Sequence, residues 1–429
     1  MFMENVFSLL AFLLLVQSFA ALVAGLRFAR YSWQALSNAR DRYVPKTAVI
    51  IPCKGLEHDF EENIVAYLAQ DYRQYELIFV TENEADPAYH VIKKILAESN
   101  RSAWLITAGE AKNRGQKVHN LCAAIDMLDA VDRKTEVLVF ADSDARPAAN
   151  WLCDLVSPLS DPRVGAATGF RWYVPVKGGF WSHLLSVWNA GTVNLFGERS
   201  AFAWGGATAI NRDTFEALHI KQQWEDGAVS DDYVLTRAVQ SEGLRIKFVP
   251  QCLVLSEAKF NFSELLEFTT RQMIITRVYA PRVWWLAAIT HSLFNFTLWG
   301  GLGAWAWGKV SGELLLPLLL TSLFLGVITG GVRGFMAAQL LSDEYSYQVK
   351  KSIWAYCLLN PLVSLLYVYN LIASAKTRRI VWRGIGYEMI SPKETVIWQR
   401  PEALSASDTS EMQRKHSEAA AGSSSSRDA

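Results

Sequence analysis

The sequence predicts an α/β domain with a mostly parallel sheet, tethered to a membrane at both of its ends. Apolar residues make up 51% of the chain and the mean hydropathy is +0.10, values that favour membrane-embedded segments. Apolar runs long enough to cross a bilayer lie near the N-terminus and after residue 282. Between them, residues 40–282 alternate β-branched runs with amphipathic segments, as a parallel sheet covered by helices requires.

Charge and cysteine content exclude some classes of function. Lys plus Arg and Asp plus Glu both number 42, so the net charge is zero and no basic field indicates a nucleic-acid partner. The five cysteines lack CxxC spacing, and their odd number fits reduced thiols better than a disulfide framework or a zinc site. We therefore expect the polar domain to face the cytosol.

An N-terminal transmembrane anchor is predicted at residues 1–30. A signal peptide would carry positive charge ahead of its apolar run, whereas Glu4 precedes this one and no small-residue cleavage site follows it. The apolar residues 6–26 are instead followed by the basic residues Arg27, Arg30, Arg40 and Arg42. The positive-inside rule then predicts a retained anchor whose C-terminal end is cytoplasmic.

The strands and helices of the middle region follow one another in a regular order. The segments TAVIIPC, YELIFVTE, AWLIT and EVLVFA predict strands at residues 47–53, 75–82, 103–107 and 136–141. Polar or amphipathic segments between them predict helices at 60–69, 88–98 and 116–128. Because ligands bind beyond the carboxyl ends of parallel strands, residues 52–55, 82–84 and 142–144 should meet at one crevice.

Three further apolar stretches, at residues 283–307, 314–329 and 353–373, predict a C-terminal transmembrane region over 283–375. Three full crossings would place the basic residues of the juxtamembrane segment, 376–400, outside the cell, against the positive-inside rule. A break at Asn360-Pro361 that makes the last stretch re-entrant would avoid this, and we expect a cytoplasmic tail. Residues 401–429 are rich in Ser, Ala, Glu and Gly and are predicted to be disordered.

Asp142 and Asp144 end the strand at residues 136–141. One residue apart, their carboxylates can bind a hard divalent cation that bridges phosphate oxygens. The alternative is a solvated turn or a helix cap. Lys54 and Lys117 provide positive charge for a diphosphate, although either can equally be a solvated surface lysine.

A second acidic cluster follows in the segment AVSDDYVL. Ser230 is suited to cap a helix, and Asp231 and Asp232 in its first turn would complement the helix dipole without any catalytic role. The alternative is catalytic: activation of a nucleophile needs a carboxylate base separate from a metal-bound leaving group, and this cluster can supply it.

These residues together resemble the ceramide glucosyltransferases and their bacterial relatives, within the family 2/21-type membrane glycosyltransferases of GT-A fold. The resemblance covers nearly the whole chain, and its longest stretch is IIPCKGLEHDFEENIVAYLAQDYRQYELIFVTENEADPA. GQKVHNL resembles the block whose lysine contacts the nucleotide diphosphate, DSDARP the metal-binding element, and SDDY the Glu/Asp-Asp-Tyr element. WRGIGYE, near Trp382, resembles the segment after the last span.

The resemblance implies a role for each matching residue. Asp142 and Asp144 would bind Mg²⁺ or Mn²⁺, and Asp232 would be the catalytic base. The acceptor would be bound by Trp204, Gly205, Gly206 and Asp231. The nucleotide-sugar would be bound by Pro52, Lys54, Gly55, Glu82, Lys117, Arg271 and Gln272.

The sequence departs from the family at two places. The acidic position after the second strand has two candidates, Glu82 and Glu84. The closing (Q/R)xxRW motif is represented by RQMIITRVY, where Arg271 or Gln272 can open the motif but the Arg-Trp pair is absent. Arg277, one helical turn further on, is a candidate substitute.

The implied function is inverting transfer of a hexose, from a UDP-sugar such as UDP-glucose, to the hydroxyl of a membrane lipid. Ceramide, diacylglycerol, a hopanoid and a polyprenyl carrier all remain possible acceptors. Residues 178–196 predict either a lipid-facing acceptor entrance or an ordinary core helix. The expected protein is a multi-pass integral protein of a bacterial inner membrane, with its catalytic domain in the cytoplasm. The alternatives are a processive polysaccharide synthase and a non-enzymatic lipid-binding pseudoenzyme.

Overall fold

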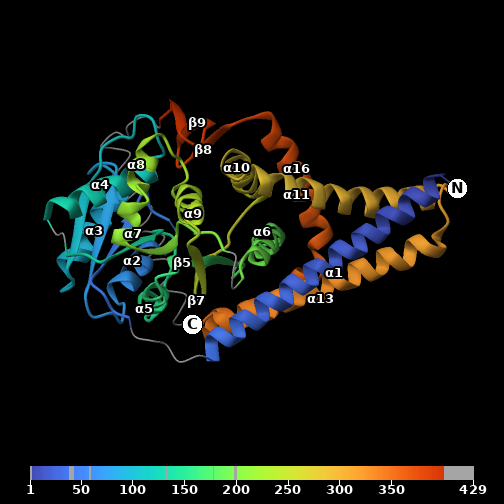
Figure 1. Cartoon of the computed structure of the whole chain (residues 1–429), viewed down its shortest axis with the longest axis horizontal. Helices are drawn as coiled ribbons and strands as arrows, with labels where there is room; N and C mark the ends of the chain where they lie inside the picture. The colour runs from blue at the N-terminus through green and yellow to red at the C-terminus, as the bar shows by residue number, and fades with distance from the viewer. Residues whose placement is uncertain are drawn as a thin grey trace, which may run out of the picture.

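The computed structural model describes residues 2–37, 43–57, 59–131, 134–176, 178–197 and 201–400. Arg40, Arg42 and the predicted disordered tail at 401–429 lie outside the described residues. Figure 1 shows an α/β domain from which a bundle of long helices projects.

The α/β domain is built on a seven-stranded sheet with the strand order β3-β2-β1-β4-β6-β5-β7. β1 pairs in parallel with both β2 and β4, β5 pairs in parallel with β7, and β6 is antiparallel to both of its neighbours. The predicted mostly parallel sheet is therefore confirmed. The strands are β1 (Thr47–Pro52), β2 (Tyr75–Thr81), β3 (Ala103–Thr107), β4 (Val137–Ala141), β5 (Val164–Val174), β6 (Ala207–Asn211) and β7 (Arg245–Glu257).

Helices bury both faces of this sheet. Alternate residues of β1 point to opposite sides, so that Ile50 packs into one apolar core and Ile51 into the other. Every residue of β4 is buried, as expected of a strand covered on both faces. The helices of this domain are α2 (Phe60–Leu68), α3 (Pro87–Ala97), α4 (Gln116–Val131), α5 (Trp151–Val156), η1 (Ser157–Ser160), α6 (Phe180–Ala190), η2 (Gly191–Leu195), α7 (Arg212–Ala217), α8 (Ile220–Glu225) and α9 (Asp231–Ser241).

The projecting bundle pairs the N-terminal helix with helices from the C-terminal part of the chain. Two helices, Phe2–Leu36 and Gly312–Leu340, are long and apolar enough to cross a membrane, and they lie side by side in Figure 1. The helices of this part are α1 (Phe2–Ser37), α10 (Phe262–Tyr279), α11 (Pro281–Asn295), the π-helical turn η3 (Phe296–Gly300), α12 (Gly301–Ala306), α13 (Gly312–Leu340), α14 (Asp343–Lys351), α15 (Ile353–Leu358) and α16 (Asn360–Lys376).

The three predicted C-terminal apolar stretches form different numbers of helices. Residues 314–329 lie within α13, which continues to Leu340 because the residues that follow, GGVRGFMAAQL, remain largely apolar. Residues 283–307 form α11 and α12, joined by the π-helical turn. Residues 353–373 are divided between α15 and α16, which meet at Leu359, next to the predicted break at Asn360-Pro361.

The juxtamembrane segment folds into a three-stranded antiparallel sheet, with the strands β8 (Arg379–Trp382), β9 (Ile385–Ser391) and β10 (Glu394–Gln399). This small sheet packs on the α/β domain. The backbone N–H of Gln116 donates to the Tyr387 hydroxyl over 3.2 Å, and the Thr395 hydroxyl donates to the Gly227 carbonyl over 2.7 Å. Residues 379–400 therefore lie on the same side of any membrane as the α/β domain.

The contact of the small sheet depends on a glycine. Gly227 has a φ of +125°, and a Cβ atom there would lie 2.5 Å from the Lys393 carbonyl oxygen. We predict that Gly227→Ala lowers the thermal unfolding midpoint of detergent-solubilised protein more than Gly243→Ala does. Gly243 also has a positive φ, +70°, but has open space around it. Both variants should lose about 1–2 kcal/mol through backbone strain, and Gly227→Ala about 1–3 kcal/mol more through overpacking. Equal losses of stability in the two variants would contradict the close packing at Gly227.

Candidate active site

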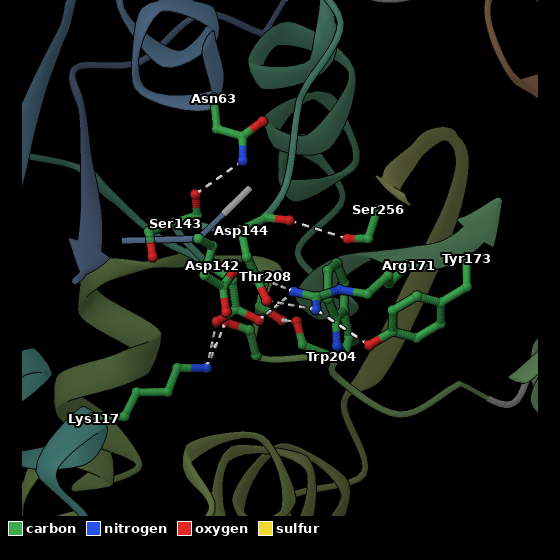
Figure 2. A network of polar contacts seen from close by, with 12 residues as sticks. Asn63, Lys117, Asp142, Ser143, Asp144, Arg171, Tyr173, Trp204, Thr208 and Ser256 are labelled. Atoms are coloured by element: carbon green, nitrogen blue, oxygen red, sulfur yellow. Dashed lines mark hydrogen bonds and ion pairs between the residues drawn. The ribbon is translucent and has the colours of Figure 1, made fainter. Parts of the chain in front are cut away.

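The segment Asp142-Ser143-Asp144 follows β4, and side chains from two other elements, α2 and β7, hold its backbone carbonyls. The Tyr67 hydroxyl donates to the Asp142 carbonyl over 2.9 Å, and the Asn63 side chain donates to the Ser143 carbonyl over 3.3 Å. The Ser256 hydroxyl donates to the Asp144 carbonyl over 3.0 Å. With the backbone fixed in this way, both aspartate side chains extend beyond the carboxyl end of the strand (Figure 2).

Arg171, on β5, binds both of these aspartates. Its Nη1 lies 2.8 Å from Asp144 Oδ2 and its Nη2 lies 3.0 Å from Asp142 Oδ2, while Nη2 also contacts Asp144 Oδ1. The guanidinium stacks over the Trp204 ring at 5.1 Å. Although burial opposes its charge, Asp144 and Asp142 hold the pKa of Arg171 well above its ordinary value.

Lys117, near the start of α4, links the aspartate pair to the second acidic cluster. Its Nζ lies 2.8 Å from Asp142 Oδ1 and 3.3 Å from Asp231 Oδ1, and donates to the Gly205 carbonyl over 3.1 Å. Burial alone would lower the pKa of Lys117, but Asp142 and Asp231 raise it. Conversely, although burial opposes ionisation of Asp142, Lys117 and Arg171 lower the pKa of its carboxyl. We call the group Lys117, Asp142, Asp144, Arg171 and Asp231 the ion cluster.

The two aspartates of the second cluster have different environments at the start of α9. Asp231 is buried, with 4% of its surface exposed, and burial raises the pKa of its carboxyl to about 6 despite Lys117. Asp232 is partly exposed; its Oδ1 accepts from the Tyr233 backbone N–H over 2.7 Å and from the Ser230 hydroxyl. The helix start that fixes Asp232 also directs Asp231 into the ion cluster. A role of the two aspartates in stabilising the start of α9 through the helix dipole is therefore compatible with a chemical role.

Helix α10 fixes the position of this helix start. The Tyr233 and Thr276 hydroxyls lie 2.9 Å apart, and the Val229 backbone N–H donates to the Tyr279 hydroxyl over 2.8 Å. In the altered motif, hydroxyl side chains thus connect α10 to the Ser-Asp-Asp-Tyr segment.

Trp204, Gly205 and Gly206 lie at the ion cluster itself. A Cβ atom on Gly205 would lie 2.3 Å from Asp231 Oδ2, and one on Gly206 would lie 2.2 Å from the Trp204 ring and 2.6 Å from Asp142 Oδ2. The glycine pair is needed because the backbone before β6 passes directly against carboxylates and an indole ring.

The predicted nucleotide-binding residues near β1 and β2 form a neighbouring polar group. Pro52 ends β1, and Lys54 Nζ lies 2.5 Å from Glu82 Oε2. The backbone N–H of Gly55 donates to Asp86 Oδ1 over 2.8 Å. Of the two acidic candidates, Glu82 is buried and ion-paired whereas Glu84 is exposed. Since β1 lies between β2 and β4, these residues and the ion cluster share one edge of the sheet.

Residues of α10 divide between the core and its margin. Arg271 stacks over the Phe268 ring at 5.4 Å and donates to the Val381 carbonyl of β8 over 3.5 Å, and Gln272 is partly buried beside it. Ile274 is buried in the apolar core. Arg277 is not positioned to substitute for the missing arginine, because its guanidinium donates to the Ser374 carbonyl of α16 over 2.7 Å.

Sequence reasoning missed two residues of this site. Arg171 carries the one charge in the strand segment VGAATGFRWYV, and a lone arginine in an otherwise apolar strand was a signal that it has a buried anionic partner. Arg400, at the end of the small sheet, lies with Nη1 2.8 Å from Glu82 Oε1. No local pattern identifies that contact, because the two residues are far apart in the sequence.

The aspartate pair fits a divalent cation. Arg171 Nη2 contacts both Asp142 and Asp144, so the two carboxylates already converge on one positively charged atom. Within the described residues, no group of three or more His, Cys, Asp or Glu side chains is arranged to hold a metal ion. Two carboxylates are nevertheless the usual protein contribution to a Mg²⁺ site whose other ligands are substrate phosphates and water.

The mostly parallel α/β sheet is like that of the GT-A glycosyltransferases, and paired carboxylates and a lysine lie at its carboxyl edge. Residues 10–395 match the family model described as glycosyl transferase family 21, and the chain therefore belongs to that family. The predicted resemblance to ceramide glucosyltransferases and the predicted GT-A fold are confirmed by this match.

Two solved structures are similar to the chain at low sequence identity. One is mannosyltransferase PcManGT from Pyrobaculum calidifontis in complex with GDP-Man and Mn²⁺, with 18% identity and a TM-score of 0.47 over 86% of this chain and 98% of that one. The other is GalNAc-T7 with UDP, GalNAc and Mn²⁺, with 15% identity and a TM-score of 0.37 over 56% of this chain and 49% of that one.

The close packing at Gly206 predicts a specific loss of activity. Gly206→Ala should displace the Trp204 ring or the Asp142 carboxylate and lower kcat/KM roughly a hundredfold, as misplacement of catalytic groups by about 1 Å can do. Gly179→Ala is the matched control, because nothing lies within 4 Å of its Cβ position and its φ is not positive. Steady-state kinetics with a radiolabelled sugar donor measure both variants. Similar rates for the two would refute the close approach at Gly206.

The raised pKa of Asp231 predicts a pH dependence of stability. A carboxyl whose pKa rises from 3.8 to about 6 on folding contributes stability below pH 4 that is lost as the pH rises through 6. Asp231→Asn lacks this titration. The free energy of unfolding of the wild type, relative to that of the variant, should therefore fall by about 1–3 kcal/mol between pH 4 and pH 7. Thermal unfolding across that range measures the difference, and a constant difference would contradict the prediction.

Proposed function

We propose that this family 21 glycosyltransferase transfers a hexose from a nucleotide diphosphate donor, UDP-glucose, to the hydroxyl of a membrane lipid of the ceramide type, with inversion at the anomeric carbon. The observation that carries the proposal is the ion cluster, in which three carboxylates and two cations meet at the carboxyl edge of the sheet. Transfer from a sugar diphosphate needs anionic groups for a metal cation and cations for the diphosphate, and Asp232, next to Asp231 of the cluster, supplies the base.

On the donor side, the residues at the ends of β1, β2 and β4 hold the nucleotide. Lys117 is mostly buried, with 15% of its side chain exposed, and keeps its charge, so it can bind a diphosphate oxygen as a fixed cation. Lys54, Gly55 and Glu82 follow the adjacent strands, where the base and ribose would lie. Pro52 shapes the turn after β1, and Arg271 and Gln272 approach from α10.

Asp144, aided by Asp142, would hold Mg²⁺ or Mn²⁺. When bound, such an ion supplies positive charge that stabilises the leaving diphosphate. Both aspartate side chains keep part of their surface exposed, 23% for Asp142 and 25% for Asp144, so a cation bound to donor phosphates can reach them.

The acceptor is activated from α9. Asp232 takes the proton of the lipid hydroxyl as that oxygen forms a bond with the anomeric carbon, and the bond from that carbon to the diphosphate oxygen breaks with its electron pair on the diphosphate. Ser230 and the start of α9 fix one oxygen of Asp232 and leave the carboxylate partly exposed to the acceptor side. Asp231 keeps Lys117 in place, and the Trp204-Gly205-Gly206 backbone forms the adjoining wall.

A lipid acceptor is supported by the position of the site relative to the helical bundle. Helix α6 packs on β5, and the Asn189 side chain donates to the Arg171 carbonyl over 2.8 Å. The same helix contacts α13, α15 and α16, and exposes Phe180 and Trp181 at its start. Aromatic side chains of this kind favour a membrane interface. The segment 178–196 is thus a core helix along most of its length, with an exposed aromatic end suited to lipid.

The same arrangement supports a multi-pass topology in a bacterial inner membrane, with the catalytic domain in the cytoplasm. The cytoplasmic side is the one that Arg27 and Arg30 favour, at the domain end of α1. α13 returns the chain to that side, so α11 and α12 must lead it away (Figure 1). Phe7 of α1 packs with Leu298 and Leu315 at the far end of the bundle, where the chain turns back.

The experiment that tests the function uses the full chain in proteoliposomes that contain ceramide, diacylglycerol or a polyprenol. We expect labelled glucose from UDP-glucose to enter a β-linked glycolipid, detected by mass spectrometry and NMR. Asp232→Asn should reduce transfer by 10²–10⁴-fold, the range for loss of a general base, while UDP binding persists. Asp226→Asn is the matched control, because Asp226 lies at the exposed end of α8 and forms only a 3.8 Å pair with Lys393. A polymeric product would favour a processive synthase, and absence of transfer with every donor and lipid would favour a pseudoenzyme.

A further inference from the structure

Arg171 occupies the position at which a cation bound to both aspartates would lie. Its Nη2 contacts both Asp142 and Asp144 (Figure 2). Its Nη1 lies 2.8 Å from Asp144, so the contact with Asp144 is bidentate. The guanidinium contacts both oxygens of Asp144 and Oδ2 of Asp142, so a divalent cation that coordinates the pair directly has to compete for these oxygens. Binding of the cation therefore weakens the contacts of Arg171, and the contacts of Arg171 weaken binding of the cation.

The surroundings of Arg171 stabilise it in this place. The side chain is 11% exposed, stacks over Trp204 at 5.1 Å and over Tyr173 at 5.7 Å, and lies 3.4 Å from the Tyr173 hydroxyl. Its Nε is buried and has no hydrogen-bond partner among the described residues. The arginine therefore depends chiefly on the two aspartates for its polar contacts, and these are the contacts that a metal ion would take over.

The charge count of the ion cluster makes this competition effective. Arg171 and Lys117 place two positive charges against Asp142 and Asp144, and Lys117 is shared with Asp231. A free metal ion would replace the contacts of the guanidinium with its own contacts to the carboxylates and form no others. When the metal ion is bound to a nucleotide diphosphate, the phosphates also bind Lys117, and this adds binding energy. The metal ion should therefore bind more tightly together with the nucleotide diphosphate than alone, because only the bound diphosphate compensates for the lost contacts of Arg171.

We propose that Arg171 is an internal competitor of the divalent cation: it holds the Asp142–Asp144 pair while the donor site is empty and gives way only to a metal ion that is bound together with the donor diphosphate. Arg171 is a positioning residue in this scheme and does not touch the reacting atoms. The proposal rests on the proposed function, because it takes the aspartate pair as the metal site of the glycosyltransferase.

Binding of Mn²⁺ to the full chain, followed by the electron paramagnetic resonance signal of the free ion, tests the proposal without reference to turnover. The wild type should bind Mn²⁺ weakly alone and more tightly with UDP or GDP. Arg171→Met should raise the affinity for Mn²⁺ alone by about tenfold or more, because the fraction of protein with free carboxylates is no longer limited by the arginine. Arg163→Met is the matched control, since Arg163 immediately precedes the same strand and pairs with Asp161 at the exposed surface. Its Mn²⁺ affinity should equal that of the wild type.

Arg171→Lys is a second test that remains available if Arg171→Met does not fold. A lysine lacks the two-pronged geometry, so this variant should bind free Mn²⁺ more tightly than the wild type, and Mn²⁺ alone should raise its thermal unfolding midpoint more than it raises that of the wild type. Unchanged Mn²⁺ affinity in both Arg171 variants, with nucleotide-dependent binding retained, would overturn the competition and leave the metal site intact. Absence of Mn²⁺ binding to the wild type even with UDP or GDP would overturn the metal site, and the competition with it.

Discussion

The ion cluster is the constraint to which the rest of the catalytic domain is fitted. Isolated carboxylates with most of their surface removed from water are costly, so Asp142, Asp144 and Asp231 require cations at short distance. Those cations come from other elements, Lys117 from α4 and Arg171 from β5. The strand order brings them together, because β6 lies between β4 and β5 and its leading glycine pair leaves room for the side chains that cross it. A change in any of these elements would leave a charge without its partner.

The projecting helical bundle is connected to the ion cluster through two helices, α10 and α6. α10 binds the start of α9 through hydroxyl pairs on one side and binds the end of α16 through Arg277 on the other. α6 binds the backbone of Arg171 and, at the same time, contacts the helices that follow α12. In the middle of α10, Ile274 and Ile275 pack in the apolar core and Thr276 pairs with the Tyr233 hydroxyl. The positive charge of the ion cluster comes from other elements, through Arg171 and Lys117.

Local patterns were sufficient for most of the catalytic sheet and insufficient for its polar contacts. The seven elements predicted between residues 47 and 141 are all present, with bounds that differ by three residues or fewer, because continuous β-branched runs and amphipathic helices carry strong periodic signals. Asp142 and Asp144 were recognisable at the end of a strand. Arg171 was not, because its pairing depends on β6 inserting between β4 and β5, an order that periodicity does not encode. Apolar content alone does not distinguish α13 from the broken pair α15 and α16, and the break between those two was expected only from Asn360-Pro361.

The small C-terminal sheet has a consequence for how the molecule is made. Tyr387 and Arg400 complete the surroundings of Gln116 and Glu82, yet they leave the ribosome after every apolar helix of the bundle. The α/β domain is thus synthesised early, and its contacts with Tyr387 and Arg400 form last. In the proposed topology, a chain whose final helices inserted in the opposite orientation would carry β8, β9 and β10 across the bilayer, away from Gln116 and Glu82. The contacts of the small sheet with the α/β domain would thus form only in chains whose helices insert correctly.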